Sequence, residues 1–370
     1  MKIVANRSAL HAAFQHAGSI ITSTIARPIY QNVKMEAKAG KVCLSATDLE
    51  VGITLNVDQV QVEEEGEVLL PELRVSRILG TTPDETISLV GDESAVTIES
   101  SDSKFRVVAE DPSDFADVPQ MTEGSVIEID RDVLHYMVRH VAFATAEERG
   151  RYALNGVLLV VAEDGGFEMV AADGARLARV RKKASNPDKK PVDCIVMKKG
   201  IEQLARLAML SEEPIKVQVT ENQLLAANSA GRLCCQLVEG QFPNYLEVIP
   251  KDCKIKVELP SRALLNALTR AALLTSEQTR AVDFTFSDGI LVLASQSPDL
   301  GEAEVRLPVD YKGEQVQIAF NPEYVTDMLK VVERESVKME FNDRRSPCVM
   351  HSGVDYVYVV SPVVREDKEA

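Results

Sequence analysis

The sequence lacks any apolar stretch long enough to cross a membrane. Its longest uninterrupted apolar run, Val157 to Ala162, is far shorter than the roughly 20 residues that a membrane-spanning helix needs. Near the amino terminus, Asn6 and Arg7 directly follow a very short apolar stretch, so we expect no signal peptide. The sequence therefore predicts a cytoplasmic protein that does not bind membranes.

Patterns typical of metal and redox sites are also missing. The six cysteines form no C-x-x-C pair, and no histidine stands at zinc-like spacing from them. His11 and His16 are five residues apart on a predicted helix, as are His135 and His140, whereas a metal pair on a helix favours a spacing of three or four. We expect buried free thiols, histidines on helix surfaces, no bound metal and no cofactor.

The common catalytic motifs are absent as well. There is no Walker A sequence, no G-x-G-x-x-G after a predicted strand, no G-x-S-x-G and no H-E-x-x-H. Asp48 and Asp173 each follow a predicted strand, where a carboxylate could act as a general base. They occupy equivalent positions in the repeat described below, which favours a turn-capping role instead. We therefore predict no catalytic residues.

The sequence does contain a pattern that occurs three times. Similar strand-like segments surround Val33, Val157 and Val282, which are 124 and 125 positions apart (157 − 33; 282 − 157). Predicted helices repeat at about the same spacing, and such a period indicates a repeated structural unit. We predict three modules, with boundaries at 1–123, 124–252 and 253–370.

Each predicted module is α+β, with two helices packed on antiparallel sheets. The expected order is strand, helix, three strands, strand, helix, three strands, because period-two apolar patterns alternate with helical ones. The helices are expected over 6–20, 71–79, 130–151, 198–209, 262–280 and 322–334.

Charge is distributed unevenly between the predicted helices and the rest of the chain. The net charge is −16, yet the six helices together carry +5, which leaves −21 (−16 − 5) for strands and loops. A basic helical surface could meet phosphates without reading bases, while the acidic remainder would repel DNA.

Four short motifs give the chain a family resemblance that covers nearly its whole length. The motifs are Arg151-Tyr152-Ala153-Leu154-Asn155-Gly156, Ala172-Asp173-Gly174-Ala175-Arg176-Leu177, Phe242-Pro243-Asn244-Tyr245 and Tyr358-Val359-Val360-Ser361-Pro362-Val363. With these motifs the chain resembles the bacterial sliding clamps, the beta subunits of DNA polymerase III.

The resemblance implies a non-catalytic processivity factor that tethers the replicative polymerase to DNA. Two chains would join head to tail in a ring whose helices line the hole, and double-stranded DNA would pass through it without sequence-specific contacts. The implied partners are a second copy of the chain, the DNA polymerase III catalytic subunit, the clamp loader and other proteins with a clamp-binding motif.

The resemblance also implies a groove between modules two and three that binds partner peptides with apolar ends. Its expected residues are mostly apolar, as a peptide pocket requires. They are Leu154, Gly174, Arg176, Leu177, Pro243, Val248, Ser346, Val359, Val360, Ser361, Pro362 and Val363.

Two further sets follow from the same resemblance. The residues expected to face DNA are Arg27, Arg74, Arg77, Arg149, Arg151, Tyr152, Lys198, Lys199 and Arg206. At the dimer interface, an edge strand over Lys104–Val108 should pair with a strand near 299–305 of the partner. The expected contacts are Phe105 and Val107 on Leu273 and Leu274, and Lys104 and Arg106 facing Glu302 and Glu304.

Two other functions remain open on the residues alone. An acidic repeat scaffold could gather peptides without encircling DNA. An enzyme could use Asp173 or Asp48 as a general base, although the sequence offers no substrate-pocket signature.

Overall fold

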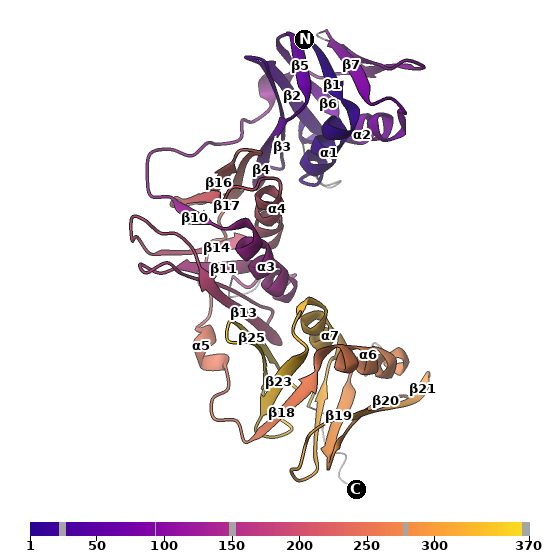
Figure 1. Cartoon of the computed structure of the whole chain (residues 1–370), viewed down its shortest axis with the longest axis vertical. Helices are drawn as coiled ribbons and strands as arrows, with labels where there is room; N and C mark the ends of the chain where they lie inside the picture. Colours follow the sequence, from indigo (N-terminus) through magenta and orange to yellow (C-terminus); the bar gives the residue numbers. More distant parts are fainter. Residues whose placement is uncertain (22–26, 93, 148–152, 277–279, 365–370) are drawn as a thin grey trace. The chain divides into compact units, whose positions relative to one another are not determined.

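The computed structural model describes residues 1–21, 27–92, 94–147, 153–276 and 280–364 (Figure 1). Contacts divide the chain into two compact units. The first unit comprises Met1–His135, Ala184–Lys190 and Lys199–Leu237, and the second comprises Tyr136–Lys183, Pro191–Lys198 and Val238–Ala370.

The first repeat contains the two predicted helices and one strand that was not predicted. This extra strand, β5, follows the three strands expected after the first helix. Its elements are β1 (Lys2–Asn6), α1 (Arg7–Gly18), η1 (Pro28–Gln31), β2 (Asn32–Lys38), β3 (Lys41–Thr47), β4 (Val51–Val57), β5 (Val60–Glu64), β6 (Gly66–Pro71), α2 (Glu72–Thr81), β7 (Thr86–Gly91), β8 (Ala95–Glu99), β9 (Lys104–Val108) and η2 (Pro112–Asp114).

The second and third repeats have the predicted order of elements, which is confirmed there strand for strand. The second contains β10 (Ile127–Ile129), α3 (Arg131–Val141), η3 (Ala142–Ala144), β11 (Gly156–Val161), β12 (Gly166–Ala172), β13 (Arg176–Lys183), β14 (Val192–Met197), α4 (Lys198–Met209), β15 (Ile215–Val219), β16 (Gln223–Asn228) and β17 (Gly231–Gln236). After a short helix, α5 (Tyr245–Val248), the third contains β18 (Ile255–Pro260), α6 (Ser261–Ala271), η4 (Ala272–Leu274), β19 (Val282–Ser287), β20 (Ile290–Ser297), β21 (Gly301–Pro308), β22 (Val316–Phe320), α7 (Pro322–Val331), β23 (Ser336–Phe341), β24 (Cys348–Ser352) and β25 (Tyr356–Val360).

Two helices end earlier than the sequence predicts. α3 and α6 each pass into one 3₁₀ turn and stop at an extended threonine, Thr145 or Thr275. The hydroxyl of each threonine donates to the carbonyl three residues before it, at 3.0 and 2.8 Å. A β-branched side chain that bonds the preceding turn disfavours continuation of the helix. The expectations over 130–151 and 262–280 were therefore too long.

The first unit contains a five-stranded and an eight-stranded sheet. The strand orders are β5-β1-β7-β8-β9 and β10-β15-β16-β17-β4-β3-β2-β6. In the larger sheet, β17 of the second repeat pairs antiparallel with β4 of the first, with Leu233 opposite Ile53. Main-chain hydrogen bonds thus join these two repeats into one continuous sheet.

The second unit repeats this arrangement with an eight-stranded and a four-stranded sheet. Their orders are β14-β11-β12-β13-β25-β24-β23-β18 and β21-β20-β19-β22. β13 of the second repeat pairs antiparallel with β25 of the third, with Leu177 opposite Val359. The strands of the second repeat are therefore shared between two sheets, which explains why the division into units passes through it.

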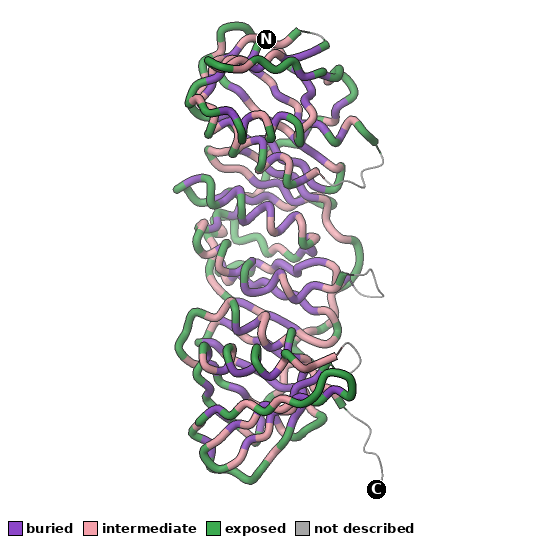
Figure 2. The backbone as a smooth tube through the Cα atoms, turned by 90° about the vertical axis from the view of Figure 1, so that its right-hand side faces the viewer, coloured by how far each residue is buried: buried purple, intermediate pink, exposed green. Residues whose placement is uncertain are grey.

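The helices are amphipathic and cover the sheets with one face. In α6 the buried residues Leu264, Ala267, Leu268 and Ala271 follow the i, i+3, i+4, i+7 spacing of a single helical stripe. Figure 1 shows α1 beside α2 and α6 beside α7. In Figure 2 buried and exposed positions alternate along many strands, as expected where only one face of a sheet meets the core.

The thiols and histidines follow the sequence expectation only in part. Five of the six cysteines are buried and Cys43 is half-buried, and all six are free. His140 is a core residue, only 1% exposed, so its prediction as a surface residue was wrong. Its Nδ1 lies 2.7 Å from the carbonyl oxygen of Tyr136, and its ring stacks on the Tyr136 ring with centroids 3.9 Å apart. No cluster able to hold a metal ion occurs among the described residues.

Candidate functional site

A tight turn with the same chemistry occurs in the first and second repeats. Asp48 Oδ1 accepts hydrogen bonds from the N–H groups of Glu50 and Val51, at 3.0 and 2.7 Å. Asp173 Oδ1 accepts from Ala175 and Arg176, both at 2.9 Å. A carboxylate that caps its own turn in this way is a structural group. The turn-capping prediction for both aspartates is confirmed.

The second oxygen of each aspartate binds a cation. Asp48 Oδ2 pairs with Lys199 Nζ of α4, which also donates to the carbonyl of Ile20. Asp173 Oδ2 pairs with Arg176 Nε at 2.9 Å. Each turn is thereby connected to the following repeat. Lys199 of the second repeat binds the Asp48 turn directly, whereas Arg176 connects the Asp173 turn to the third repeat.

Arg176 uses three nitrogen atoms to connect the second and third repeats. Besides Asp173, it donates to Asp327 Oδ2 of α7 and to the carbonyl of Phe143, both at 2.8 Å. Its guanidinium lies 4.5 Å from the centre of the Tyr324 ring. Burial disfavours the charge, yet the hydrogen bond to Asp327 and the neighbouring Tyr358 and Asp173 raise the pKa of Arg176 above its usual value. Arg176 is thus permanently charged, and each of its three guanidinium nitrogen atoms donates a hydrogen bond.

Next to Arg176, residues of the paired strands β13 and β25 take part in an apolar cluster, here called the junction cluster. Its buried members are Ala153, Leu158, Val170, Ala172, Leu177, Ile195, Cys253, Val349 and Val359. Ser361 N donates to the carbonyl of Ala175 at 2.8 Å, which places the segment after β25 beside the Asp173 turn. Of the predicted groove residues, Leu177 and Val359 belong to this cluster and Leu154 packs against it.

The predicted groove residues differ in exposure. Leu177, Val359 and Val360 are buried, whereas Gly174 and Val248 are exposed. The others are half-buried: Leu154, Arg176, Pro243, Ser346, Ser361, Pro362 and Val363. Pockets that bind apolar groups are lined by buried and half-buried apolar side chains of this kind.

Several residues of this region were not among the predicted set. Phe242, Tyr245 and Ile249 pack on the junction cluster. Phe242 and Tyr245 belong to one of the motifs that carry the resemblance, so the signal was present. Glu168 was also missed, although a single acidic residue between Phe167 and Met169 in an apolar strand indicates a buried charge.

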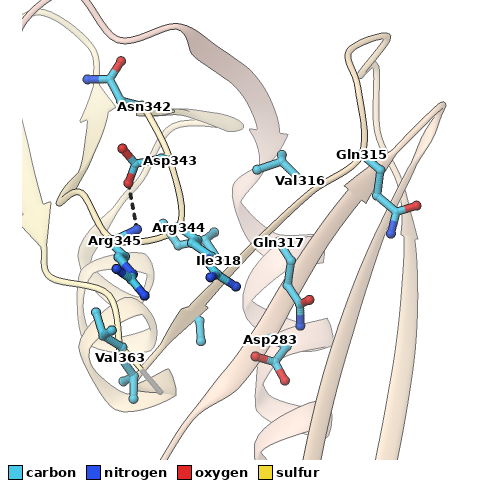
Figure 3. Close-up of a pocket in the computed structure, with 12 residues that line it drawn as sticks. Asp283, Gln315, Val316, Gln317, Ile318, Asn342, Asp343, Arg344, Arg345 and Val363 are labelled. Carbon is cyan, nitrogen blue, oxygen red and sulfur yellow. Dashed lines mark hydrogen bonds between the residues drawn. The ribbon is translucent and has the colours of Figure 1, made fainter. Parts of the chain in front are cut away.

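A cavity of about 480 Å³ lies next to this region, between β22 and the loop after β23 (Figure 3). In Figure 3 the loop carrying Arg344 and Arg345 faces the Gln315 and Gln317 side chains of the opposite wall. Val363 lines the cavity, and its N–H donates to the carbonyl of Ala319 at 2.8 Å. This hydrogen bond holds the predicted groove segment against β22.

The residues predicted to face DNA are mostly exposed where they are described. Arg27, Arg74, Arg77, Lys198 and Arg206 are exposed. Lys199 is half-buried, with its ammonium group bound by Asp48 as described above. Arg149, Arg151 and Tyr152 lie outside the described residues.

The residues predicted at the dimer interface lie on two edge strands and on η4, which contacts β21. β9 is the last strand of the five-stranded sheet and β21 the last of the four-stranded sheet. Phe105 and Leu273 are exposed, at 38% and 73%, whereas Val107 is already buried within its own sheet. Lys104, Arg106, Glu302 and Glu304 are exposed and Leu274 is half-buried.

Comparison with known protein families gives one result along the chain. Residues 1–119, 128–244 and 246–363 match the N-terminal, central and C-terminal domains of the DNA polymerase III beta subunit. The chain belongs to the bacterial sliding-clamp family. Members of this family are non-catalytic processivity factors of DNA polymerase, and this clamp has the same function.

Individual relatives match nearly the whole of this chain. The chain is 29% identical to the beta sliding clamp of Chlamydia trachomatis, covering 99% of this chain and 88% of that protein. The DNA polymerase III beta subunit of Thermotoga maritima has a TM-score of 0.91 at 27% identity, with 99% and 100% of the two chains covered. A Pseudomonas aeruginosa clamp bound to griselimycin has a TM-score of 0.90 at 28% identity, with the same coverage.

Proposed function

We propose that two copies of this clamp join head to tail in a closed ring that encircles double-stranded DNA in the cytoplasm. The ring would hold the DNA polymerase III catalytic subunit, the clamp loader and other proteins that carry a clamp-binding peptide. The three modules would have the boundaries predicted above, at 1–123, 124–252 and 253–370.

The observation that carries the proposal is the pair of open sheet edges. β9 presents Lys104 and Arg106, and β21 presents Glu302 and Glu304. An edge strand has unpaired main-chain N–H and C=O groups, and pairing with a second chain satisfies them. Opposite charges on the two edges favour a head-to-tail contact over pairing of either edge with itself.

Exposed basic side chains on the helices support a sequence-independent DNA contact. Arg74 and Arg77 are exposed on α2, and Lys198 and Arg206 on α4. Phosphate contacts of this kind carry affinity without base recognition, which a sliding protein requires. We assign Lys199 a lesser share, because its ammonium group is bound by Asp48.

The junction cluster supports the proposed peptide site. Leu177 and Val359 are buried members of this cluster and half-buried Leu154 packs against it, so an apolar side chain of a partner would extend an existing apolar surface. Griselimycin is bound by relatives from Pseudomonas aeruginosa and Bartonella birtlesii. We expect it to bind this clamp and to compete with a partner peptide.

Retention on DNA tests the ring. The clamp would be loaded onto nicked circular plasmid by a bacterial clamp loader with ATP, washed in high salt and then exposed to a linearising nuclease. A topological ring stays on circles through the wash and leaves once the DNA has ends. Equal release by salt from circles and linear DNA would instead indicate ordinary electrostatic binding.

A matched control makes the negative result informative. The Pseudomonas aeruginosa clamp, loaded in parallel, verifies the loader. If that clamp is retained and this one never is, while a partner peptide still binds, the encircling function is contradicted and the peptide-scaffold alternative stands.

A further inference from the structure

The short helix α5 forms one side of the proposed peptide groove and is too short to be stable as an isolated helix. It comprises the four residues Tyr245–Val248, whereas isolated helices shorter than about 12 residues are marginal in water. Leu246 and Val248 of this helix are about half exposed. The position of Val248 therefore depends on how the rest of α5 is fastened to the sheet beneath it.

Tyr245 is the fastening residue. Its ring packs on the junction cluster and meets the ring of Phe242 at 6.3 Å between centroids. Its hydroxyl donates to the carboxylate of Glu168 on β12. Burial and this hydrogen bond raise the pKa of the Tyr245 phenol, so the hydroxyl remains a donor at neutral pH.

Glu168 is itself held in place by arginines of the neighbouring strand. Its side chain is only 11% exposed, and a charge so buried must be paired. Arg179 Nη2 donates to Glu168 Oε2 at 2.6 Å, and Arg181 Nε lies 3.5 Å from the same oxygen. In the β12–β13 register, Glu168 lies opposite Arg181 and Val170 lies opposite Arg179, so these contacts come from rigid paired strands.

We propose that Glu168, held by Arg179, is a positioning residue that sets the affinity of the groove for apolar peptides by fixing α5 through the Tyr245 hydroxyl. This inference rests on the proposed peptide site. Glu168 does not touch the peptide in this scheme; it raises the fraction of molecules in which Val248 is correctly placed. The apparent Kd is inversely proportional to that fraction, so it rises when the fraction falls.

Three substitutions test the contact, and Tyr245→Phe changes least else, because Glu168→Ala also leaves Arg179 without its carboxylate partner. Tyr245→Phe removes one hydroxyl and keeps the ring on the junction cluster. Glu168→Ala removes the acceptor, and Glu168→Gln keeps an acceptor oxygen without the charge. Tyr311→Phe is the matched control, because its hydroxyl donates to the Glu314 carbonyl, within the loop between β21 and β22.

The first measurement is the Kd of a fluorescein-labelled synthetic peptide that copies the clamp-binding segment of the polymerase catalytic subunit. Loss of a hydrogen bond of ordinary net strength corresponds to a change in Kd of about three- to tenfold. We expect that increase in Kd for Tyr245→Phe and Glu168→Ala, a smaller one for Glu168→Gln and none for Tyr311→Phe. The double variant of Tyr245 and Glu168 should lose no more than the larger single loss.

The second measurement reports on α5 without any peptide. The sequence contains no tryptophan, so Leu246→Trp introduces a single fluorophore on this helix, outside the predicted groove residues. In this background, Tyr245→Phe and Glu168→Ala should increase acrylamide quenching and lower the fluorescence anisotropy. Tyr311→Phe should change neither.

The two readouts separate the possible failures. Unchanged quenching and unchanged Kd in both variants would overturn the positioning role. Increased quenching with an unchanged Kd would also overturn it, because α5 would then move without affecting binding. If the unsubstituted chain binds no peptide while the quenching effect is present, the proposed groove is wrong, and the claim that Glu168 sets peptide affinity fails with it.

Discussion

At the scale of single residues, Arg176 shows how one side chain connects two repeats. Its side chain is 11% exposed and satisfies three acceptors, from the Asp173 turn, from η3 and from α7. Removing one partner of a buried ion pair leaves the other charge unpaired, which costs more than the pair contributes when intact. The arginine expected in the groove therefore has a second, structural role.

Replacing Arg176 should destabilise the second unit. We expect Arg176→Ala to lower the free energy of unfolding by about 3 kcal/mol, since Asp173 and Asp327 would lose a shared cation. Circular dichroism during urea denaturation would measure it. The control is Arg139→Ala, whose partner Glu333 lies 3.1 Å away in an exposed pair, and which should cost less than about 1 kcal/mol. Equal losses in the two variants would contradict the role of Arg176.

His140 is the residue through which pH should act on the second unit. Burial lowers the pKa of His140, and nearby Arg139 adds to this, against smaller opposing effects of the Tyr136 carbonyl, Glu333 and Asp355. The unfolded chain then binds more protons than the folded chain just below the ordinary histidine pKa of about 6.5. Stability is therefore present above that pH and is lost as the pH falls below it.

A phenylalanine at position 140 should reduce this pH dependence. We expect His140→Phe to narrow the difference in Tm between pH 7.5 and pH 5.5, because the ring stack on Tyr136 remains while the titrating group is gone. Some dependence should persist, since burial also lowers the pKa of His16 and His351. His135→Gln, at an exposed position, is the control. An unchanged Tm difference in His140→Phe would contradict the assignment.

At the scale of elements, the two linkers between repeats each contain a valine, and these two valines differ in burial. Val118 follows η2 in the first linker and is 4% exposed, packed with Leu225 and Cys234. A Cβ on Gly52 would lie 3.2 Å from the Val118 side chain, so the two are in close contact. Val248 in the second linker is 49% exposed. The valine of the first linker is thus buried, whereas the valine of the second linker stays exposed.

The ion pair between Asp48 and Lys199 likewise connects two elements, the turn after β3 and helix α4. We expect Lys199→Met to lower the free energy of unfolding of the first unit by about 2 kcal/mol, because a largely buried carboxylate loses its cation. Lys198→Met, at the exposed neighbouring position, should leave stability nearly unchanged. Thermal unfolding followed by circular dichroism compares the two, and an equal effect of both substitutions would show that the Asp48 contact is not stabilising.

At the scale of the whole molecule, we expect the open edges of β9 and β21 to determine how many chains assemble. Phe105 on β9 and Leu273 on η4, which contacts β21, are exposed and would be covered in the proposed head-to-tail dimer. Val107 lies in its own core, so its share of the contact should be small. Burial of large apolar side chains supplies most of the driving force for such association.

Truncating the apolar residues of the third repeat should therefore yield a monomer. We expect the double variant Leu273→Ala, Leu274→Ala to shift the mass by light scattering to that of one 40.6 kDa chain. The matched control is Leu246→Ala, an exposed leucine on α5, which should remain dimeric. A dimer mass in the Leu273 and Leu274 variant at micromolar concentration would contradict this interface.

Much of the fold follows from local patterns. The order of elements in the second and third repeats, the buried thiols and the Asp173 turn all depend on neighbours within a few residues. The helix ends at Thr145 and Thr275, the extra strand β5 and the burial of His140 were not foreseen, because each depends on contacts that the periodicity of one segment does not contain.

The sequence by itself determined the threefold repeat, the amphipathic helices and the separation of charge between helices and strands, since these are properties of residue order. Only the tertiary structure decided that β17 joins β4 and β13 joins β25, that Lys199 binds Asp48 and that Glu168 holds Tyr245. The reason is physical. Strand pairing across repeats joins residues at least 176 positions apart (231 − 55; 356 − 180), and the free energy of that pairing depends on which surfaces remain unburied once each repeat has folded.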